Sequence, residues 1–252
     1  MKSALPIQHG DGARMEMLSD GEADLVFCSP PYWPPEADLA LHARRSEQTD
    51  ISDMETLILS TARKQRPVFQ EIARVLRHGR ALILQTKDIR YGEFLVPLSD
   101  THVSVAASCG LHLITRLIWI PERSASWRTP GFAKRPAIGG FKAADGESFI
   151  VMAHADGLDP GPSIDLGQAE ARALVSPLWR MNARPRKDDH PQATPRAVVR
   201  RLIQLFSEPG DLVVDPFAGR GTILEIALSL GRRAIGWEID RKHIIAVNGG
   251  AP

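Results

Sequence analysis

The sequence contains few of the features that mark secreted, membrane-bound or metal-binding proteins. It has only two cysteines, Cys28 and Cys109, and their wide separation matches neither a disulfide framework nor a metal-ligand pattern. No apolar run reaches the length of a membrane helix, and the first residues lack the apolar core and cleavage site of a signal peptide. We therefore expect a reduced, cytoplasmic setting with no membrane partner and no bound metal.

The chain also lacks an excess of either charge, since 31 basic and 30 acidic residues give a net charge of +1. The overall charge therefore does not indicate a nucleic-acid partner. Basic residues are nevertheless concentrated in two stretches. Such runs most often form a solvated face, and they indicate phosphate contacts only if another feature points to DNA. The first stretch contains Arg123, Arg128, Lys134, Arg135 and Lys142, and the second contains Arg180, Arg184, Arg186 and Lys187.

What is present is an ordinary globular composition over 252 residues, with 43% hydrophobic and 24% charged residues. This length suits one α/β domain with a modest insertion. Runs typical of buried strands cover residues 23–28, 81–85, 113–120, 149–153 and 211–214, with weaker candidates before Gly10 and at 234–238. Helical spacing covers 68–76, 195–206 and 223–230. The alternation predicts a mostly parallel sheet with helices on both faces.

The interval from about 121 to 186 differs from the rest of the chain. It is rich in Pro, Gly and basic residues, with one strand-like run and one helix-like run at 168–175. One interpretation is a set of surface loops. The other is an insertion that touches the substrate, because loops on a rigid scaffold often carry the residues that read a substrate. The residues of the interval leave both interpretations open.

The most specific local motif is Asp215-Pro216-Phe217-Ala218-Gly219-Arg220-Gly221-Thr222, directly after a predicted strand. A glycine turn between a strand and a helix lets the backbone approach a nucleotide-like ligand closely. Leu224 stands at the third glycine position of the dinucleotide fingerprint, and no Gly-Lys-Ser/Thr follows as in a phosphate loop. Glu238 ends the next predicted strand, about 20 residues on, where a carboxylate can accept both ribose hydroxyls. The combination predicts a nucleoside ligand without a pyrophosphate.

A second motif, Ser29-Pro30-Pro31-Tyr32, follows the predicted strand at 23–28. The two prolines fix φ and lack N–H donors, so their carbonyls remain as outward acceptors. Ser29 adds a hydroxyl and Tyr32 an aromatic face, and this combination suits an aromatic amine. By itself, however, the tetrapeptide is more typical of an ordinary proline turn after a strand.

Together the two motifs resemble those of the DNA amino-methyltransferases, in the permuted class whose catalytic motif precedes the cofactor motif. The resemblance covers nearly the whole chain, in the family's order. One departure is Trp33-Pro34-Pro35 after the tetrapeptide, which either adds a second aromatic wall or stiffens the loop. The other matching segments are Gly10-Asp11 with 24–27, then 74–79, 82–89, 117–120 and 190–195.

The resemblance implies a Rossmann-like methyltransferase fold with a mostly parallel seven-stranded sheet and S-adenosyl-L-methionine as cofactor. It also implies a single catalytic domain over 1–252 with a small target-recognition insertion at about 121–186. The cofactor would be lined by Phe217, Gly219, Gly221 and Thr222, with Asp215 and Pro216 shaping the turn, Glu238 on the ribose, Asp11 on the adenine amino group, and His190 and Thr194 beside the methionine part.

For the target base, the resemblance assigns the catalytic role to the tetrapeptide Ser29-Pro30-Pro31-Tyr32. Ser29 and the Pro30 carbonyl would accept hydrogen bonds from the target amine, and Tyr32 would stack on a base flipped out of the duplex. A Ser at the first motif position favours the N4 amine of cytosine, with adenine N6 as the alternative. Methylation at carbon 5 is disfavoured because it uses a cysteine in a Pro-Cys motif, and we expect Cys28 to be a core residue.

With this resemblance, double-stranded DNA becomes the expected partner, and the basic stretches become phosphate contacts. A restriction-modification role would add a cognate restriction endonuclease, and a homodimer stays open. Two other functions compete: a non-catalytic DNA- or nucleoside-binding module, and an RNA- or protein-directed methyltransferase. The intact motifs disfavour the first, and their order disfavours the second. The expected DNA-contacting residues are Arg123, Arg128, Lys134, Arg135, Arg184, Arg186 and Lys187.

Overall fold

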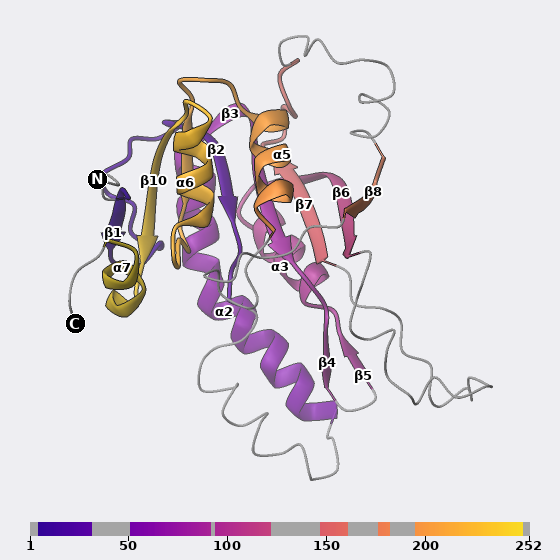
Figure 1. Cartoon of the computed structure of the whole chain (residues 1–252). Helices are drawn as coiled ribbons and strands as arrows, with labels where there is room; N and C mark the ends of the chain where they lie inside the picture. Colours follow the sequence, from indigo (N-terminus) through magenta and orange to yellow (C-terminus); the bar gives the residue numbers. More distant parts are fainter. Residues whose placement is uncertain are drawn as a thin grey trace.

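A computed structural model describes residues 5–31, 51–91, 94–121, 147–160, 176–181 and 195–248. Its centre is an eight-stranded sheet with the order β1-β10-β9-β2-β3-β7-β6-β8, shown in Figure 1. Among these strands only β7 runs against the others. The strands are β1 (Ile7–His9), β2 (Ala23–Cys28), β3 (Leu76–Thr86), β6 (His112–Pro121), β7 (Glu147–Ala153), β8 (Leu178–Met181), β9 (Leu212–Asp215) and β10 (Arg233–Glu238).

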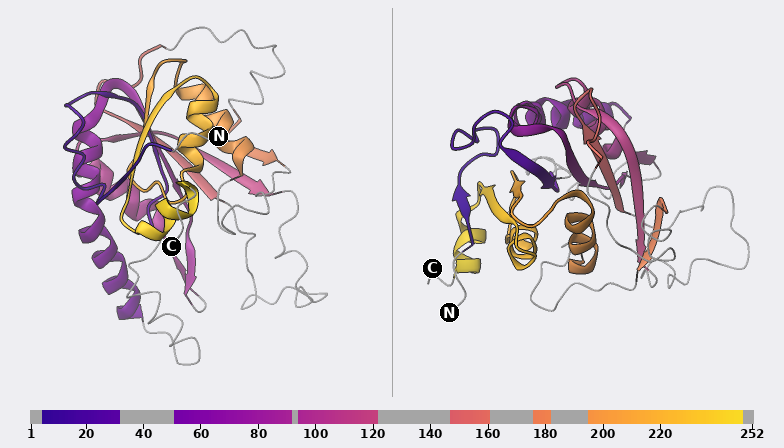
Figure 2. Two further views of the ribbon diagram at one scale, coloured as in Figure 1. Left: turned by 60° about the vertical axis from the view of Figure 1, so that its left-hand side comes forward. Right: turned by 90° about the horizontal axis from the view of Figure 1, so that it is seen from above.

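Helices cover both faces of the sheet. Figure 2 shows α2 and α3 on one face, and α5 and α6 on the other. A short hairpin of β4 and β5 follows β3 along the chain. None of the described helices is long and apolar enough to span a bilayer. The helices are α2 (Ile51–Val75), α3 (Leu98–Ala107), α5 (Arg196–Phe206), α6 (Thr222–Ser229) and α7 (Arg241–Asn248), and the hairpin strands are β4 (Ile89–Tyr91) and β5 (Phe94–Val96).

The central strand β2 shows why the sequences of the sheet strands are continuous apolar runs. All six of its residues are buried. Val26 and Cys28 pack with the core on the α2 and α3 side, whereas Leu25 and Phe27 pack with the core on the α5 and α6 side. A strand covered on both faces has no polar face, so it loses the alternation of a half-exposed strand.

The predicted α/β sheet is confirmed, but helices α3 and α7 and the β4–β5 hairpin were not predicted, and three further differences concern β8, α2 and the interval at 121–186. The sheet has an eighth strand, β8, which the sequence did not predict. Helix α2 begins at Ile51, well before the predicted 68–76, and continues through Pro67. Strands β7 and β8 both lie between 121 and 186, so the described part of that interval contributes two strands to the main sheet. The predicted helix at 168–175 lies outside the described residues.

The pairing of β2 with β9 is the topological switch point of the sheet. The two strands are parallel neighbours, with Leu25 opposite Val213 and Val26 opposite Val214. From β2 the chain crosses through α2 to β3 on one side, and from β9 it crosses through α6 to β10 on the other side. In open α/β sheets such a switch point is where ligands bind, outside the carboxyl ends of the strands.

The close packing of β10 against the turn after β9 generates the first prediction. A Cβ at Gly236 would lie 2.8 Å from Ala218 Cβ and 2.9 Å from the Asp215 carbonyl oxygen. We expect Gly236→Ala to lower the free energy of unfolding by about 1–3 kcal/mol, as overpacking does, measured by urea denaturation. Gly10→Ala is the matched control, because its Cβ would meet Trp237 Cδ1 at an ordinary 3.6 Å. Equal stability of the two variants would contradict this packing.

Candidate active site at the carboxyl edge of the sheet

The segment after β9 forms a tight turn that is hydrogen-bonded to the end of β10. Gly219 and Gly221 have φ of 52° and 72°, a conformation that glycine adopts without a steric penalty. The Gly219 amide donates to Glu238 Oε2 at 2.8 Å, and the Ala218 amide donates to the Trp237 carbonyl at 2.8 Å. The glycine turn and the Glu238 carboxylate are therefore held together as one unit.

Glu238 retains hydrogen-bonding capacity for a ligand. Its Oε2 accepts from Gly219, and its Oε1 accepts from the Asp240 amide at 2.7 Å. An ionised carboxylate offers about four lone-pair positions. These backbone donors orient the carboxylate and leave acceptor positions that two ribose hydroxyls can use.

Asp215, the last residue of β9, is buried, and its carboxyl group accepts a hydrogen bond from the start of the glycine turn. Its Oδ1 accepts from the Phe217 amide at 3.0 Å, and the residue is only 2% exposed. Burial is the main reason that the pKa of Asp215 rises to about 7; the Phe217 amide opposes the rise, and the Glu238 carboxylate adds to it. A cation bound nearby would favour the ionised form of Asp215.

The loop after β1 brings Asp11 to the same edge of the sheet. The Gly10 amide donates to the Glu238 carbonyl at 3.1 Å. Gly12 packs so closely on Pro216 that a Cβ would lie 2.4 Å from the Pro216 carbonyl oxygen. Asp11, between these two glycines, is exposed, and its Oδ1 accepts from the Ala13 amide at 2.9 Å. Asp11 therefore lies beside the glycine turn.

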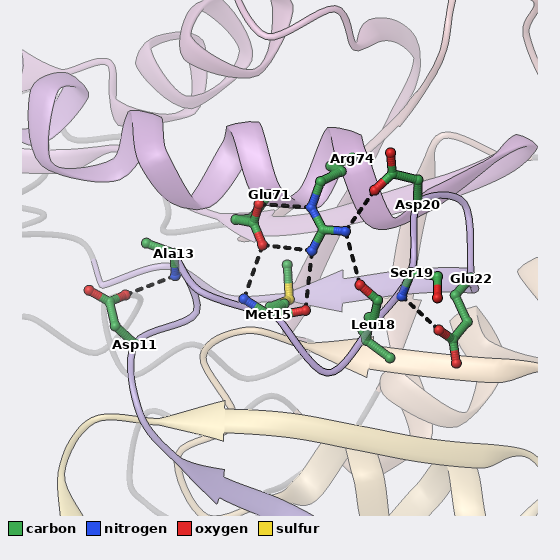
Figure 3. A network of polar contacts seen from close by, with 9 residues as sticks. All are labelled: Asp11, Ala13, Met15, Leu18, Ser19, Asp20, Glu22, Glu71 and Arg74. Atoms are coloured by element: carbon green, nitrogen blue, oxygen red, sulfur yellow. Dashed lines mark hydrogen bonds and ion pairs between the residues drawn. The ribbon is translucent and has the colours of Figure 1, made fainter.

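Two residues of α2 that the sequence did not single out fasten this loop to the helix, as Figure 3 shows. The Arg74 guanidinium donates to the carbonyls of Met15 and Leu18 at 3.2 and 2.9 Å, and it pairs with Asp20 and Glu71 at 2.8 and 2.9 Å. Glu71 in turn accepts from the Met15 amide at 3.0 Å. The hydrogen bond from Arg74 lowers the pKa of Glu71, which keeps this carboxylate ionised. The pair therefore clamps the loop that carries Asp11.

The Ser-Pro turn after β2 lies next to the glycine turn after β9. Val26 pairs with Val214, and Ser29 and Phe217 each stand three residues further along their parallel strands. Ser29 is half-buried and Pro30 is buried. The two motifs, far apart in the sequence, therefore meet at one edge of one sheet.

The thiol that precedes this turn has no nucleophilic character. Cys28 is fully buried and packs in the core on the α2 side. Burial, with a further contribution from the Asp215 carboxylate, raises the pKa of the Cys28 thiol well above its usual value. Because the thiolate is the reactive form of cysteine, Cys28 is inert. The prediction that Cys28 is a core residue is confirmed.

Ten of the predicted site residues lie outside the described parts of the chain. Their roles remain predictions. They are Tyr32 of the tetrapeptide, His190 and Thr194 of the methionine-side segment, and the basic residues Arg123, Arg128, Lys134, Arg135, Arg184, Arg186 and Lys187.

Comparison with known proteins establishes the family to which this site belongs. A family model of the N6/N4 type, described as DNA methylase, matches residues 23–248. The chain belongs to the N6/N4 DNA methylase family. The type II methyltransferase M.MjaI of Methanocaldococcus jannaschii is 26% identical over 92% of this chain and 86% of its own length. The DNA adenine methyltransferase YhdJ of Escherichia coli is 44% identical over 23% of this chain and 19% of its own length.

Solved structures share the fold of this DNA methylase. A Thermus thermophilus protein named as a DNA modification methylase, in complex with S-adenosyl-L-methionine, superposes with a TM-score of 0.70 at 23% identity, over 95% of this chain and 91% of its own. The PvuII DNA methyltransferase, described as cytosine-N4-specific, superposes with a TM-score of 0.72 at 14% identity, over 97% of this chain and 88% of its own. The predicted methyltransferase fold and cofactor are confirmed, and the chain is an S-adenosylmethionine-dependent DNA methyltransferase.

The residues at the carboxyl edge fit this cofactor. Glu238 has acceptor positions for the ribose, and the exposed carboxylate of Asp11 can accept from an adenine amino group. At Gly219 the turn backbone is open, since a Cβ there would meet no atom closer than 4.0 Å, whereas Gly221 is buried against Leu5 and Ile7. The desolvated Asp215 is next to this turn, where a sulfonium cation would offset the cost of its ionisation.

The raised pKa of Asp215 generates a prediction about stability. The pKa of about 7 in the folded protein exceeds the ordinary value of 3.8. Because the folded state binds this proton more tightly than the unfolded state, Asp215 contributes its full share to the free energy of unfolding below about pH 4. This contribution is lost as the pH rises through about 7. Asp215→Asn keeps the Oδ1 acceptor and cannot ionise. We expect it to gain a few kcal/mol of stability relative to the parent between about pH 4 and pH 8, measured from thermal midpoints.

The matched control for this experiment is Glu16→Gln, which neutralises an exposed carboxylate. This variant reports, over the same pH range, the effect of removing one negative charge from the protein surface without changing a buried group. A pH-independent difference between Asp215→Asn and the parent would show that burial does not raise the pKa of Asp215.

Proposed function

We propose that this DNA methylase transfers the methyl group of S-adenosylmethionine to the exocyclic N4 amine of cytosine at a specific site in DNA. The observation that carries the proposal is the pairing of β2 with β9, which sets the Ser29–Pro30 turn beside the glycine turn. Ser29 at the first motif position supports cytosine over adenine. The shared fold with the PvuII enzyme, described as cytosine-N4-specific, supports the same base.

In this proposal the Ser-Pro turn makes the target amine nucleophilic. A base amine reacts poorly because its lone pair is delocalised into the ring. The Ser29 hydroxyl and the Pro30 carbonyl are acceptors for its two N–H groups, and these hydrogen bonds favour a pyramidal nitrogen with a localised lone pair. S-adenosylmethionine, when bound, supplies an electrophilic methyl group. In-line attack of the amine on this methyl would break the sulfur–methyl bond, leave S-adenosylhomocysteine and release one amine proton to solvent. The Ser-Pro turn would act by positioning and electrostatics, which provide most of the rate enhancement in such a transfer.

DNA recognition completes the proposal. Flipping the target base out of the duplex costs a few kcal/mol, and stacking on an aromatic side chain returns about 1–3 kcal/mol; we assign this stacking to Tyr32. The stretches at 122–146 and 182–190 hold the basic residues that we assign to phosphate contacts and target recognition. The likeness to a type II methyltransferase supports a restriction-modification role with a cognate endonuclease.

Adenine-N6 methylation is the second candidate function. YhdJ is described as a DNA adenine methyltransferase, and its matching segment of 57 residues is 44% identical to this chain. The experiment that separates the two is sequencing of DNA from cells expressing the protein by a method that distinguishes the two modified bases. We expect N4-methylcytosine in one sequence context. N6-methyladenine in its place would establish the second function, and DNA that carries neither modified base would overturn the proposal.

Substitution of Ser29 tests the catalytic turn itself. Removing one preorganised polar partner of the reacting group costs about 3–4 kcal/mol in an enzyme site. We therefore expect Ser29→Ala to lower kcat about 100-fold or more, with the Kd for S-adenosylmethionine unchanged, measured by transfer of a radiolabelled methyl group and by calorimetry. Ser229→Ala, at an exposed position at the end of α6, is the matched control. Full activity of Ser29→Ala would remove Ser29 from the mechanism.

A further inference from the structure

Gln65 is a buried polar side chain of α2 that faces the Ser-Pro turn. It is 6% exposed, and its Nε2 donates to the Pro31 carbonyl at 2.9 Å. Among the described residues its Oε1 has no hydrogen-bond partner, and neither has the buried hydroxyl of Thr61, one helical turn earlier. A buried amide with an unsatisfied oxygen costs free energy. The hydrogen bond to the Pro31 carbonyl is therefore the interaction that offsets the cost of burying Gln65.

The Ser-Pro turn depends on donors from outside itself. Pro30 and Pro31 have no N–H group, so their backbone can be held only through carbonyl oxygens. The ring of Pro31 also fixes its φ near about −65°. A hydrogen bond that holds the Pro31 carbonyl therefore restricts the preceding peptide group, and this group carries the Pro30 carbonyl.

We propose that Gln65 is a positioning residue for methyl transfer, which anchors the Pro31 carbonyl so that the acceptors of Ser29 and Pro30 face the target amine. This proposal rests on the proposed catalytic role of that turn. A misplacement of about 1 Å can lower an enzymatic rate about 100-fold. The glycine turn follows β9 and Glu238 ends β10, so the anchor on α2 affects kcat and leaves cofactor affinity unchanged.

The first test replaces Gln65 with Leu, which has a similar size and no donor. We expect Gln65→Leu to lower kcat for DNA methylation at least tenfold while the Kd for S-adenosylmethionine stays within twofold of the parent. Gln70→Leu is the matched control, because Gln70 is exposed on the same helix. Ile72→Val, a buried change on the same helix, controls for a general loss of stability and should leave kcat near the parental value.

The second test uses pH to restore the donor. In Gln65→Glu the carboxyl group can donate to the Pro31 carbonyl only when it is protonated. Burial raises the pKa of a carboxyl group, so the ratio of the variant's kcat to the parent's should rise at least threefold as the pH falls from about 8.5 to about 6. Cofactor binding is measured in parallel over the same pH range. A merely structural role would not raise the kcat ratio while the Kd for S-adenosylmethionine stays constant.

The outcomes separate this inference from the proposed function. If Ser29→Ala is inactive while Gln65→Leu keeps the parental kcat, the positioning role of Gln65 is wrong and the catalytic turn stands. A loss of cofactor affinity in Gln65→Leu equal to the loss in kcat would also overturn the role, because it would show a general structural effect. Full activity of Ser29→Ala would overturn both.

Discussion

The direct pairing of β2 with β9 is the constraint on which the rest of this structure depends. The two strands are parallel, so both end at the same edge, and their crossover helices lie on opposite faces of the sheet. At the amino ends, Asp24 Oδ2 accepts from the Leu212 amide at 2.8 Å, a contact between residues 188 positions apart in the sequence. Arg77 pairs with the same carboxylate. These contacts at the amino ends fix the register of β2 against β9. The register in turn sets the two turns side by side at the carboxyl ends.

Electrostatics at that edge suit a positively charged ligand. The pKa of Asp215 is raised mainly because the carboxyl group has lost its water, and the neighbouring Glu238 carboxylate adds to the rise. A sulfonium cation near the glycine turn would offset both effects. Binding of a cationic cofactor and ionisation of Asp215 are therefore linked. The same desolvation keeps the Cys28 thiol protonated beneath the turn.

Sequence patterns predicted the parts of the fold whose signal is local. The buried strands and the two turn motifs were found, because strand runs and glycine or proline turns are written in consecutive residues. Strand β8 was missed because four residues give no periodicity. Helix α3 buries Ser99, Thr101 and His102, so its apolar pattern is weak, and Pro67 obscured the first half of α2. The roles of Gln65 and Arg74 depend on partners 34 to 59 residues away, which no local pattern encodes.

Helix α2 connects the two halves of the site. Near its end Arg74 and Glu71 hold the loop that carries Asp11, and nine residues before Arg74, Gln65 holds the Pro31 carbonyl. At 1.5 Å per residue these two anchors lie roughly 13 Å apart along the helix axis. The loop that carries Asp11 and the turn that we propose to hold the target base are thus fastened to one helix, which contains Pro67 between the two anchors. The proposed methyl transfer requires the loop and the turn at a fixed separation, and their attachment to one helix supplies a spacing that neither could maintain alone.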